Sequence, residues 1–160
     1  MAKALGGGLP IGAMICSEKV AKSFKPGDHG TTFGGNPLVT EVAEMTFKKI
    51  NRPEMFSEVL KKGKIIKECL KSLNNDFKFF DEIRGRGLMI GAVLSASLKN
   101  NAQEIVSECQ KRGVLLLSAG PNVIRFLPPL NINEEDLNIG LDRVESALKY
   151  FYKKNASSIK

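Results

Sequence analysis

Apolar residues recur at three- and four-residue steps through residues 53–73. They stand at Phe56, Val59, Leu60, Ile66, Leu70 and Leu73. This spacing is typical of an amphipathic helix. Five lysines fall between them and are expected mainly on the outer face: Lys61, Lys62, Lys64, Lys67 and Lys71. The pattern predicts a helix with a basic side facing solvent, on which Glu58 and Lys62 can pair one turn apart.

Four further helices are predicted from the residues that start and stop them. Asn36 followed by Pro37 is an N-cap with proline at the first helical position. Asn133 precedes three acidic residues, which complement the dipole of a helix start. Ser17 is a candidate N-cap, and Gly113 ends a helical stretch. The predicted ranges are 18–24, 37–50, 102–111 and 134–152.

Two hairpins are predicted in the second half of the chain. Strands over residues 77–83 and 87–94 are expected around an Arg-Gly-Arg-Gly turn at residues 84–87. Strands over residues 114–117 and 123–127 are expected around Ala-Gly-Pro-Asn. Strands with helices on one side predict an α+β fold.

The first 47 residues differ in kind from the rest. Residues 1–12 and 29–37 are rich in glycine and proline, and a brief strand is expected at residues 13–16. Such loops bury little surface to offset the entropy lost on ordering, so they rarely begin a free-standing domain. We therefore expect residues 1–47 to be the end of a larger domain, followed by a small α+β domain over residues 48–160.

The composition is that of a globular domain. The 160 residues are 42% hydrophobic, and no apolar run is long enough to span a bilayer. Cys16, Cys69 and Cys109 are widely spaced without a CxxC pair, so neither a disulfide framework nor a zinc site is expected. The expected location is the reducing cytoplasm, without a membrane partner.

The formal net charge of +7 raises the question of nucleic-acid binding. Much of the excess lies in residues 48–78, where nine Lys or Arg stand against four Asp or Glu. A solvated helix face explains this run, and the stretch has neither interleaved aromatics nor a DNA-binding signature. Nucleic acid is not expected as a partner.

Three segments carry candidate chemistry. Lys3 stands just before a run of three glycines. A lysine delivered into a crowded site can form a Schiff base with an aldehyde, although an ordinary surface lysine is the simpler interpretation. Thr31 and Thr32 lie in a glycine-rich turn at a helix entrance, which suits an anion such as phosphate or is a turn with hydroxyl caps.

The third segment contains Arg125, inside the apolar run Val-Ile-Arg-Phe-Leu-Pro-Pro. An arginine in such a strand needs an anionic partner, because desolvating the charge alone is costly. Its planar fork fits a carboxylate at two points. The partner is either a bound substrate or a protein carboxylate in a structural ion pair.

In this order, the segments resemble the C-terminal part of a class III aminotransferase, the pyridoxal-phosphate family that includes acetylornithine and ornithine aminotransferases. The resemblance runs from residue 2 to about residue 152. It is carried by Ala2-Lys-Ala-Leu-Gly-Gly-Gly-Leu-Pro-Ile-Gly-Ala13, by the stretch from Pro26 to Leu38, by Arg84-Gly-Arg-Gly-Leu-Met-Ile-Gly91, and by Gly120-Pro-Asn-Val-Ile-Arg-Phe-Leu-Pro-Pro-Leu130. The Gly-Gly-Gly-Leu-Pro-Ile-Gly-Ala and Ala-Gly-Pro-Asn-Val-Ile-Arg forms favour the acetylornithine member.

The resemblance implies the fold and the site roles. The chain would be the small C-terminal domain of a fold-type I enzyme with the last segment of its large α/β domain. Lys3 would hold the aldehyde of pyridoxal 5'-phosphate and shuttle the substrate proton. Thr32 would reach the cofactor phosphate of the other subunit in a homodimer. Thr31 would lie by the substrate, and Arg125 would bind the carboxylate of an amino acid or 2-oxo acid.

The chain departs from the family in length. The portion before the cofactor lysine, which in such enzymes supplies the acidic partner of the pyridine nitrogen, is absent here. We therefore expect the chain alone to be inactive and the whole enzyme to move an amino group from N-acetylornithine to 2-oxoglutarate, a step of arginine biosynthesis. The alternatives are an ornithine or succinylornithine transaminase, or a non-enzymatic remnant that binds a partner.

Overall fold

The computed structural model describes residues 1–155. The chain divides into two compact units, an N-terminal unit, Met1–Pro53, and a C-terminal unit from Glu54 onward. The division follows the end of α2 at Ile50, whereas the sequence had suggested a boundary after residue 47.

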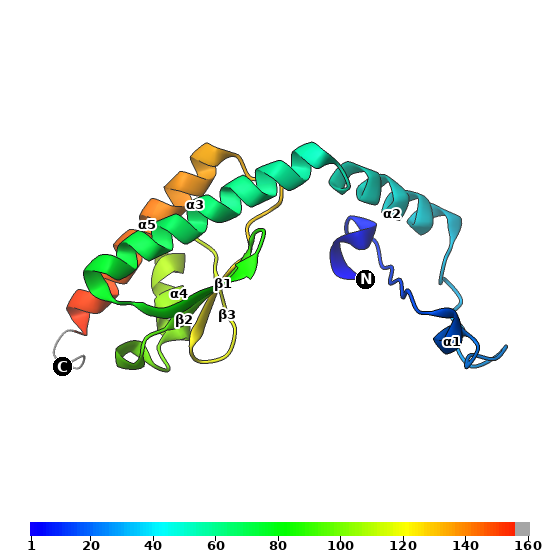
Figure 1. The fold of residues 1–160 in the computed structure, drawn as a ribbon, viewed down its shortest axis with the longest axis horizontal. Helices are drawn as coiled ribbons and strands as arrows, with labels where there is room; N and C mark the ends of the chain where they lie inside the picture. Colours follow the sequence, from blue (N-terminus) through cyan, green and yellow to red (C-terminus); the bar gives the residue numbers. More distant parts are fainter. Residues whose placement is uncertain (156–160) are drawn as a thin grey trace. The chain divides into compact units, whose positions relative to one another are not determined.

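The N-terminal unit is made of short elements and one regular helix (Figure 1). They are η1 (Lys3–Gly6), α1 (Glu18–Ala21) and α2 (Pro37–Ile50). The predicted cap of α2 is confirmed, because the Asn36 side chain accepts a hydrogen bond from the Val39 N–H at 3.1 Å. Ser17 precedes α1 in extended conformation but makes no capping bond with its side chain, and α1 is shorter than predicted.

The strand expected at residues 13–16 is not formed. Residues 10–17 have no regular structure, and Met14 and Ile15 are 69% and 85% exposed. An extended segment becomes a strand only when a second strand satisfies its backbone groups, and the N-terminal unit contains no strand in the part the structure describes. The predicted strand at residues 13–16 was wrong, because these residues have no partner strand in the described part of the N-terminal unit.

The C-terminal unit is an antiparallel sheet with helices on one face (Figure 1). Its elements are α3 (Pro53–Phe77), β1 (Phe80–Arg86), β2 (Met89–Leu94), η2 (Ala96–Leu98), α4 (Ala102–Lys111), β3 (Leu117–Ser118), β4 (Val123–Phe126) and α5 (Glu134–Lys154). The strand order is β1-β2-β4-β3. The predicted α+β class is confirmed.

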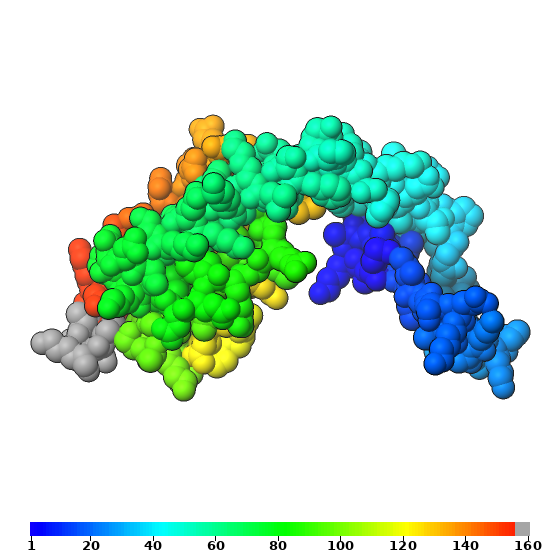
Figure 2. All heavy atoms as spheres, viewed as in Figure 1, coloured from blue at the N-terminus to red at the C-terminus, as the bar shows by residue number. Residues whose placement is uncertain are grey.

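One hydrophobic core lies between the sheet and its helices. It combines Ile66 and Leu70 of α3, Ile105 of α4 and Leu148 of α5 with the inward residues of the strands, such as Ile90. Figure 2 shows atoms filling the space between α3 and the strands. The alternate residues of the strands form an open face, on the side of the sheet away from this core.

The first hairpin turns two residues later than predicted. Arg86 pairs with Met89, so the loop is Gly87-Leu88. Gly87 has φ +52°, a left-handed conformation that favours glycine. Gly87 also lies against α3, because a Cβ added at Gly63 would be 2.3 Å from the Gly87 carbonyl oxygen. Glycine at both positions allows the turn to contact the helix.

The boundaries of β1 and β3 also differ from the prediction. Helix α3 extends to Phe77, and β1 begins only at Phe80, whose backbone N–H and carbonyl both bond the Asn74 side chain. Residues 114–116 are not paired, and β3 is confined to Leu117–Ser118. These limits depend on contacts between distant residues, which local pattern does not specify.

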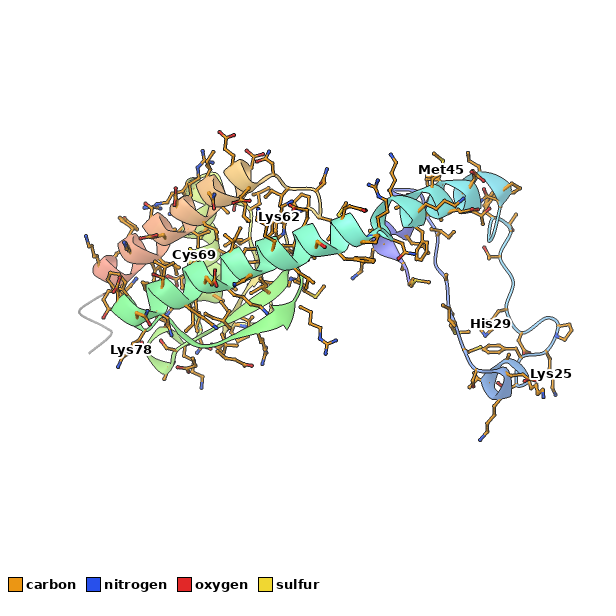
Figure 3. All side chains as sticks on the ribbon, turned by 45° about the horizontal axis from the view of Figure 1, so that its top comes forward. Lys25, His29, Met45, Lys62, Cys69 and Lys78 are labelled. Atoms are coloured by element: carbon orange, nitrogen blue, oxygen red, sulfur yellow. The ribbon has the colours of Figure 1, made fainter. Side chains whose placement is uncertain are left out.

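Lys62 lies on the inner side of α3, not the outer side that the sequence predicted (Figure 3). The residue is 6% exposed, because positions 59, 62 and 66 share a helix face. Its predicted ion pair with Glu58 is present, at 3.1 Å. Leu60, expected on the apolar face, is 65% exposed.

Helix α5 begins as predicted. The Asn133 side chain accepts from the Asp136 N–H at 2.7 Å, and three acidic residues occupy the first turn. None of the helices within residues 1–155 is both long and apolar enough to cross a lipid bilayer.

Candidate functional site

Lys3 begins η1, the short helix at the start of the N-terminal unit. Its backbone is left-handed, with φ +55°, which is uncommon for a residue with a side chain. The residue is exposed, and its amine makes no hydrogen bond or ion pair with another described residue. No described residue therefore blocks access to this amine.

The glycines after Lys3 allow η1 to fold back closely. A Cβ at Gly6 would be 2.8 Å from Ile11 Cγ2, so the return of the chain leaves no room for one. Gly7 ends η1 with φ +58°, and a Cβ there would be 3.1 Å from the Thr46 hydroxyl of α2. The glycine run thus fixes the Lys3 turn against α2.

Thr31 and Thr32 lie in the turn before α2, and both are exposed. Neither hydroxyl bonds another described residue, so both are available to a ligand. Gly34 lies close to this turn, because a Cβ there would be 2.1 Å from Thr31 Cγ2 and the threonine side chain would have to move. The turn joins α2 through Asn36, whose side-chain amide donates to the Phe33 carbonyl at 2.8 Å.

The helix entrance itself offers few backbone donors. Pro37 has no N–H, and the N–H groups of Val39 and Thr40 bond Asn36. The sequence had suggested that the amide groups and dipole at this helix start would bind an anion. In the structure, the free threonine hydroxyls are the better candidates.

The structure does not bring the threonine turn to Lys3 within the N-terminal unit. The loop around His29 lies beside α1, away from η1 and α2 (Figures 1 and 3). It is ordered by local contacts, since the His29 and Phe24 rings are 5.7 Å apart and Asp28 accepts from the Lys25 N–H at 2.7 Å. A single chain therefore holds Lys3 and the threonine hydroxyls at two separate places in the N-terminal unit.

Arg125 lies in β4 of the C-terminal unit, on the open face of the sheet. Ile124 and Phe126 on either side are buried in the core, whereas Arg125 is half-buried. It pairs with Gly91 of β2 and Leu117 of β3. Burial therefore alternates along this strand.

The guanidinium of Arg125 has an unsatisfied polar atom. Its Nε is buried without a hydrogen-bond partner, and no carboxylate of the described residues forms an ion pair with it. A buried donor without a partner costs about 1–3 kcal/mol. The surroundings therefore favour an external anion such as a carboxylate.

Gly91 is the neighbour that sequence reasoning missed. The sequence pattern gave it no role of its own, but it lies directly opposite Arg125. The alternation of residues 89–94 could have placed Gly91 on the open face. Its pairing with Arg125 depends on strand register, for which the sequence carries no local signal.

Metal chemistry has no visible site in this part of the chain. Within residues 1–155, no group of three or more His, Cys, Asp or Glu side chains is placed to hold a metal ion. The candidate chemistry is that of a free amine, two hydroxyls and a guanidinium.

Comparison with known proteins gives the class. Residues 1–148 match the family model described as aminotransferase class-III. The chain therefore belongs to the class III aminotransferase family, whose members use pyridoxal phosphate as cofactor.

Among solved structures, the N-acetylornithine aminotransferase from Stenotrophomonas maltophilia K279a is 40% identical, with a TM-score of 0.83. The match covers 94% of this chain and 39% of that one. The ornithine delta-aminotransferase of Plasmodium falciparum is 30% identical, with a TM-score of 0.84, over 96% of this chain and 40% of that one. The chain thus spans about two fifths of these enzymes, and its fold is part of the fold-type I architecture.

Proposed function

We propose that this chain is the C-terminal part of an aminotransferase that moves an amino group from N-acetylornithine to 2-oxoglutarate. The enzyme would be a cytoplasmic homodimer of arginine biosynthesis. The 40% identity to the N-acetylornithine aminotransferase from Stenotrophomonas maltophilia supports this donor.

Lys3 would hold the cofactor and move the proton. Its free Nζ and the close turn of glycines behind it fit the attachment of an aldehyde-bearing cofactor. When bound, pyridoxal 5'-phosphate supplies an electron sink for the bond broken at the substrate α-carbon. Lys3 Nζ would take the proton released there and return it to the product.

Thr32 would bind the cofactor phosphate, and Thr31 would lie beside the substrate. Their free hydroxyls support this, and the separation of their turn from η1 supports a contact with the cofactor of the other subunit. In a homodimer each subunit would then supply its lysine to one site and its threonine to the other.

Arg125 would bind the substrate carboxylate, and the observation that carries the proposal is its buried, unpartnered Nε. The open face places the guanidinium at a surface where a ligand can reach it. A carboxylate there would satisfy Nε and form a two-point contact with the planar fork.

The test is the Arg125→Lys substitution in a longer polypeptide. That polypeptide contains this chain together with the part of the neighbouring enzymes that the match does not cover. Lysine retains the charge but loses the fork. We expect the KM for glutamate and 2-oxoglutarate to rise while the melting temperature and the bound cofactor persist. A lower melting temperature with an unchanged KM would instead indicate a structural arginine.

Two controls separate the alternatives. The same enzyme assayed with acetylornithine, ornithine and succinylornithine identifies the donor by the ratio of kcat/KM values. The 160-residue chain supplied with cofactor should show no turnover, because none of its residues is assigned to the pyridine nitrogen. Turnover by that chain would contradict the assignment.

A further inference from the structure

Two arginines face each other across a glycine on the open face of the sheet. Arg84 of β1 pairs with Gly91 of β2, and Gly91 pairs with Arg125 of β4. Residues paired directly across antiparallel strands project to the same face. Arg84, Gly91 and Arg125 therefore form one row, and the Cα atoms of the two arginines are about 10 Å apart from two strand spacings.

Gly91 itself places no side chain between the arginines. A Cβ at Gly91 would lie 3.9 Å from Arg84 Cγ and 3.2 Å from Val123 Cγ1. The stem of Arg84 therefore lies beside Gly91. Two positive charges placed so closely compete for any anion on this face.

One carboxylate occurs among the paired residues of the open face. Glu82 pairs with Val93 in the adjacent row, and in the described sheet it is the only acidic residue paired there. Arg84 Nη1 donates to Glu82 Oε2 at 2.9 Å. The acidic residue paired on this face is thus held by Arg84, while Arg125 Nε has no partner among the described residues.

We propose that Arg84 is a positioning residue that keeps Glu82 away from Arg125. Glu82 lies two strands and two residues from Arg125, about 12 Å between Cα atoms from standard sheet spacings, within the combined reach of two extended side chains. If Glu82 were free, it would neutralise Arg125 and compete with a substrate carboxylate. The inference rests on the proposed function of Arg125 and explains why this arginine stays unpaired beside a glutamate.

The test measures the Nε–H signal of Arg125 by nitrogen-15 NMR of the 160-residue chain. Because this Nε is buried, its proton exchanges slowly and is observable, and Arg125→Lys assigns the signal by removing it. We expect Arg84→Gln to shift the Arg125 signal as Glu82 moves to it. Adding Glu82→Gln to that variant should restore the wild-type position.

Two variants control for charge and for fold. Arg86→Gln removes a positive charge of the same hairpin that has no ion pair among the described residues, and should leave the signal in place. Arg84→Lys can still hold Glu82 and should also leave it in place. An unchanged signal in Arg84→Gln, or a shift that Glu82→Gln does not reverse, would overturn the proposal.

Titration with 2-oxoglutarate separates this inference from the proposed function. We expect Arg84→Gln to weaken binding at the Arg125 signal by about two- to fivefold, the range of an exposed ion pair, and Glu82→Gln to restore it. A different result is an Arg125 signal that never responds to 2-oxoglutarate and still shifts with the Arg84 and Glu82 substitutions. That result would support the pairing of Arg84 with Glu82 and reject the substrate-binding role of Arg125.

Discussion

The contact between α3 and the first hairpin gives a prediction whose sign depends on structure alone. In an open helix, Gly→Ala stabilises by about 0.8–1 kcal/mol. At Gly63 the new Cβ would be 2.3 Å from the Gly87 carbonyl oxygen and 3.0 Å from the Gly87 carbonyl carbon. These are backbone atoms that cannot rotate away, so the hairpin must move.

The size of the effect follows from this geometry. To reach an ordinary contact of 3.4 Å, the Gly87 oxygen must retreat by about 1 Å. Such overpacking typically costs about 1–3 kcal/mol. The shift also strains the bond that Lys67 Nζ donates to the Gly85 carbonyl, at 2.8 Å. After the propensity gain, we expect Gly63→Ala to lower the free energy of unfolding by up to about 2 kcal/mol.

Gly140→Ala is the matched control. Gly140 also lies inside a long helix, α5, but a Cβ there would meet nothing within 4 Å. This variant should gain about 0.5–1 kcal/mol. Urea unfolding followed by circular dichroism measures both, and at a slope of about 2 kcal/mol per molar the Gly63→Ala midpoint should fall by up to roughly 1 M. Equal stabilisation of both variants would refute the close contact.

Three further predictions concern the candidate site and the core. Borohydride reduction of the cofactor-loaded enzyme, followed by digestion, should leave the pyridoxyl label on the Lys3 peptide; a label on another lysine would reject Lys3. Thr32→Val should weaken cofactor affinity roughly ten- to a hundredfold, because a hydrogen bond to a charged group contributes about 1.5–3 kcal/mol; equilibrium binding that matches wild type would leave Thr32 as a turn residue. Burial raises the pKa of the Cys109 thiol to about 11 from 9, so the unfolded chain ionises first. The free energy of unfolding, measured relative to the Cys109→Ala variant, should be constant below pH 9 and fall by up to about 1.4 kcal/mol per pH unit from pH 9 to 11. Parallel pH profiles of wild type and variant would contradict this.

Local signals predicted the parts of the fold that depend on a few adjacent residues. The N-caps at Asn36 and Asn133 were predicted because a cap is a contact over three residues. The need of Arg125 for an anionic partner was predicted because its neighbours in the strand are apolar. Lys62 was placed wrongly, because its type outweighed its position between Val59 and Ile66 on the inner face.

The parts that were not predicted depend on pairing between distant segments. Residues 13–16 have the composition of a strand but no strand partner in the N-terminal unit as described. The sequence allows the hairpin turn at either Gly85 or Gly87. The observed turn, at Gly87, agrees with the close contact between Gly87 and Gly63. Neither fact can be read from residues within one segment.

Arg125 shows how local and distant information combine at a binding residue. Its own strand specifies that the guanidinium leaves the core, but not whether a protein carboxylate meets it. That depends on β1, where Glu82 is bound to Arg84, and on β2, where Gly91 adds no side chain between the two arginines. The Arg125 guanidinium thus remains available to a ligand, because the sheet register separates it from Glu82, the carboxylate paired on the same face.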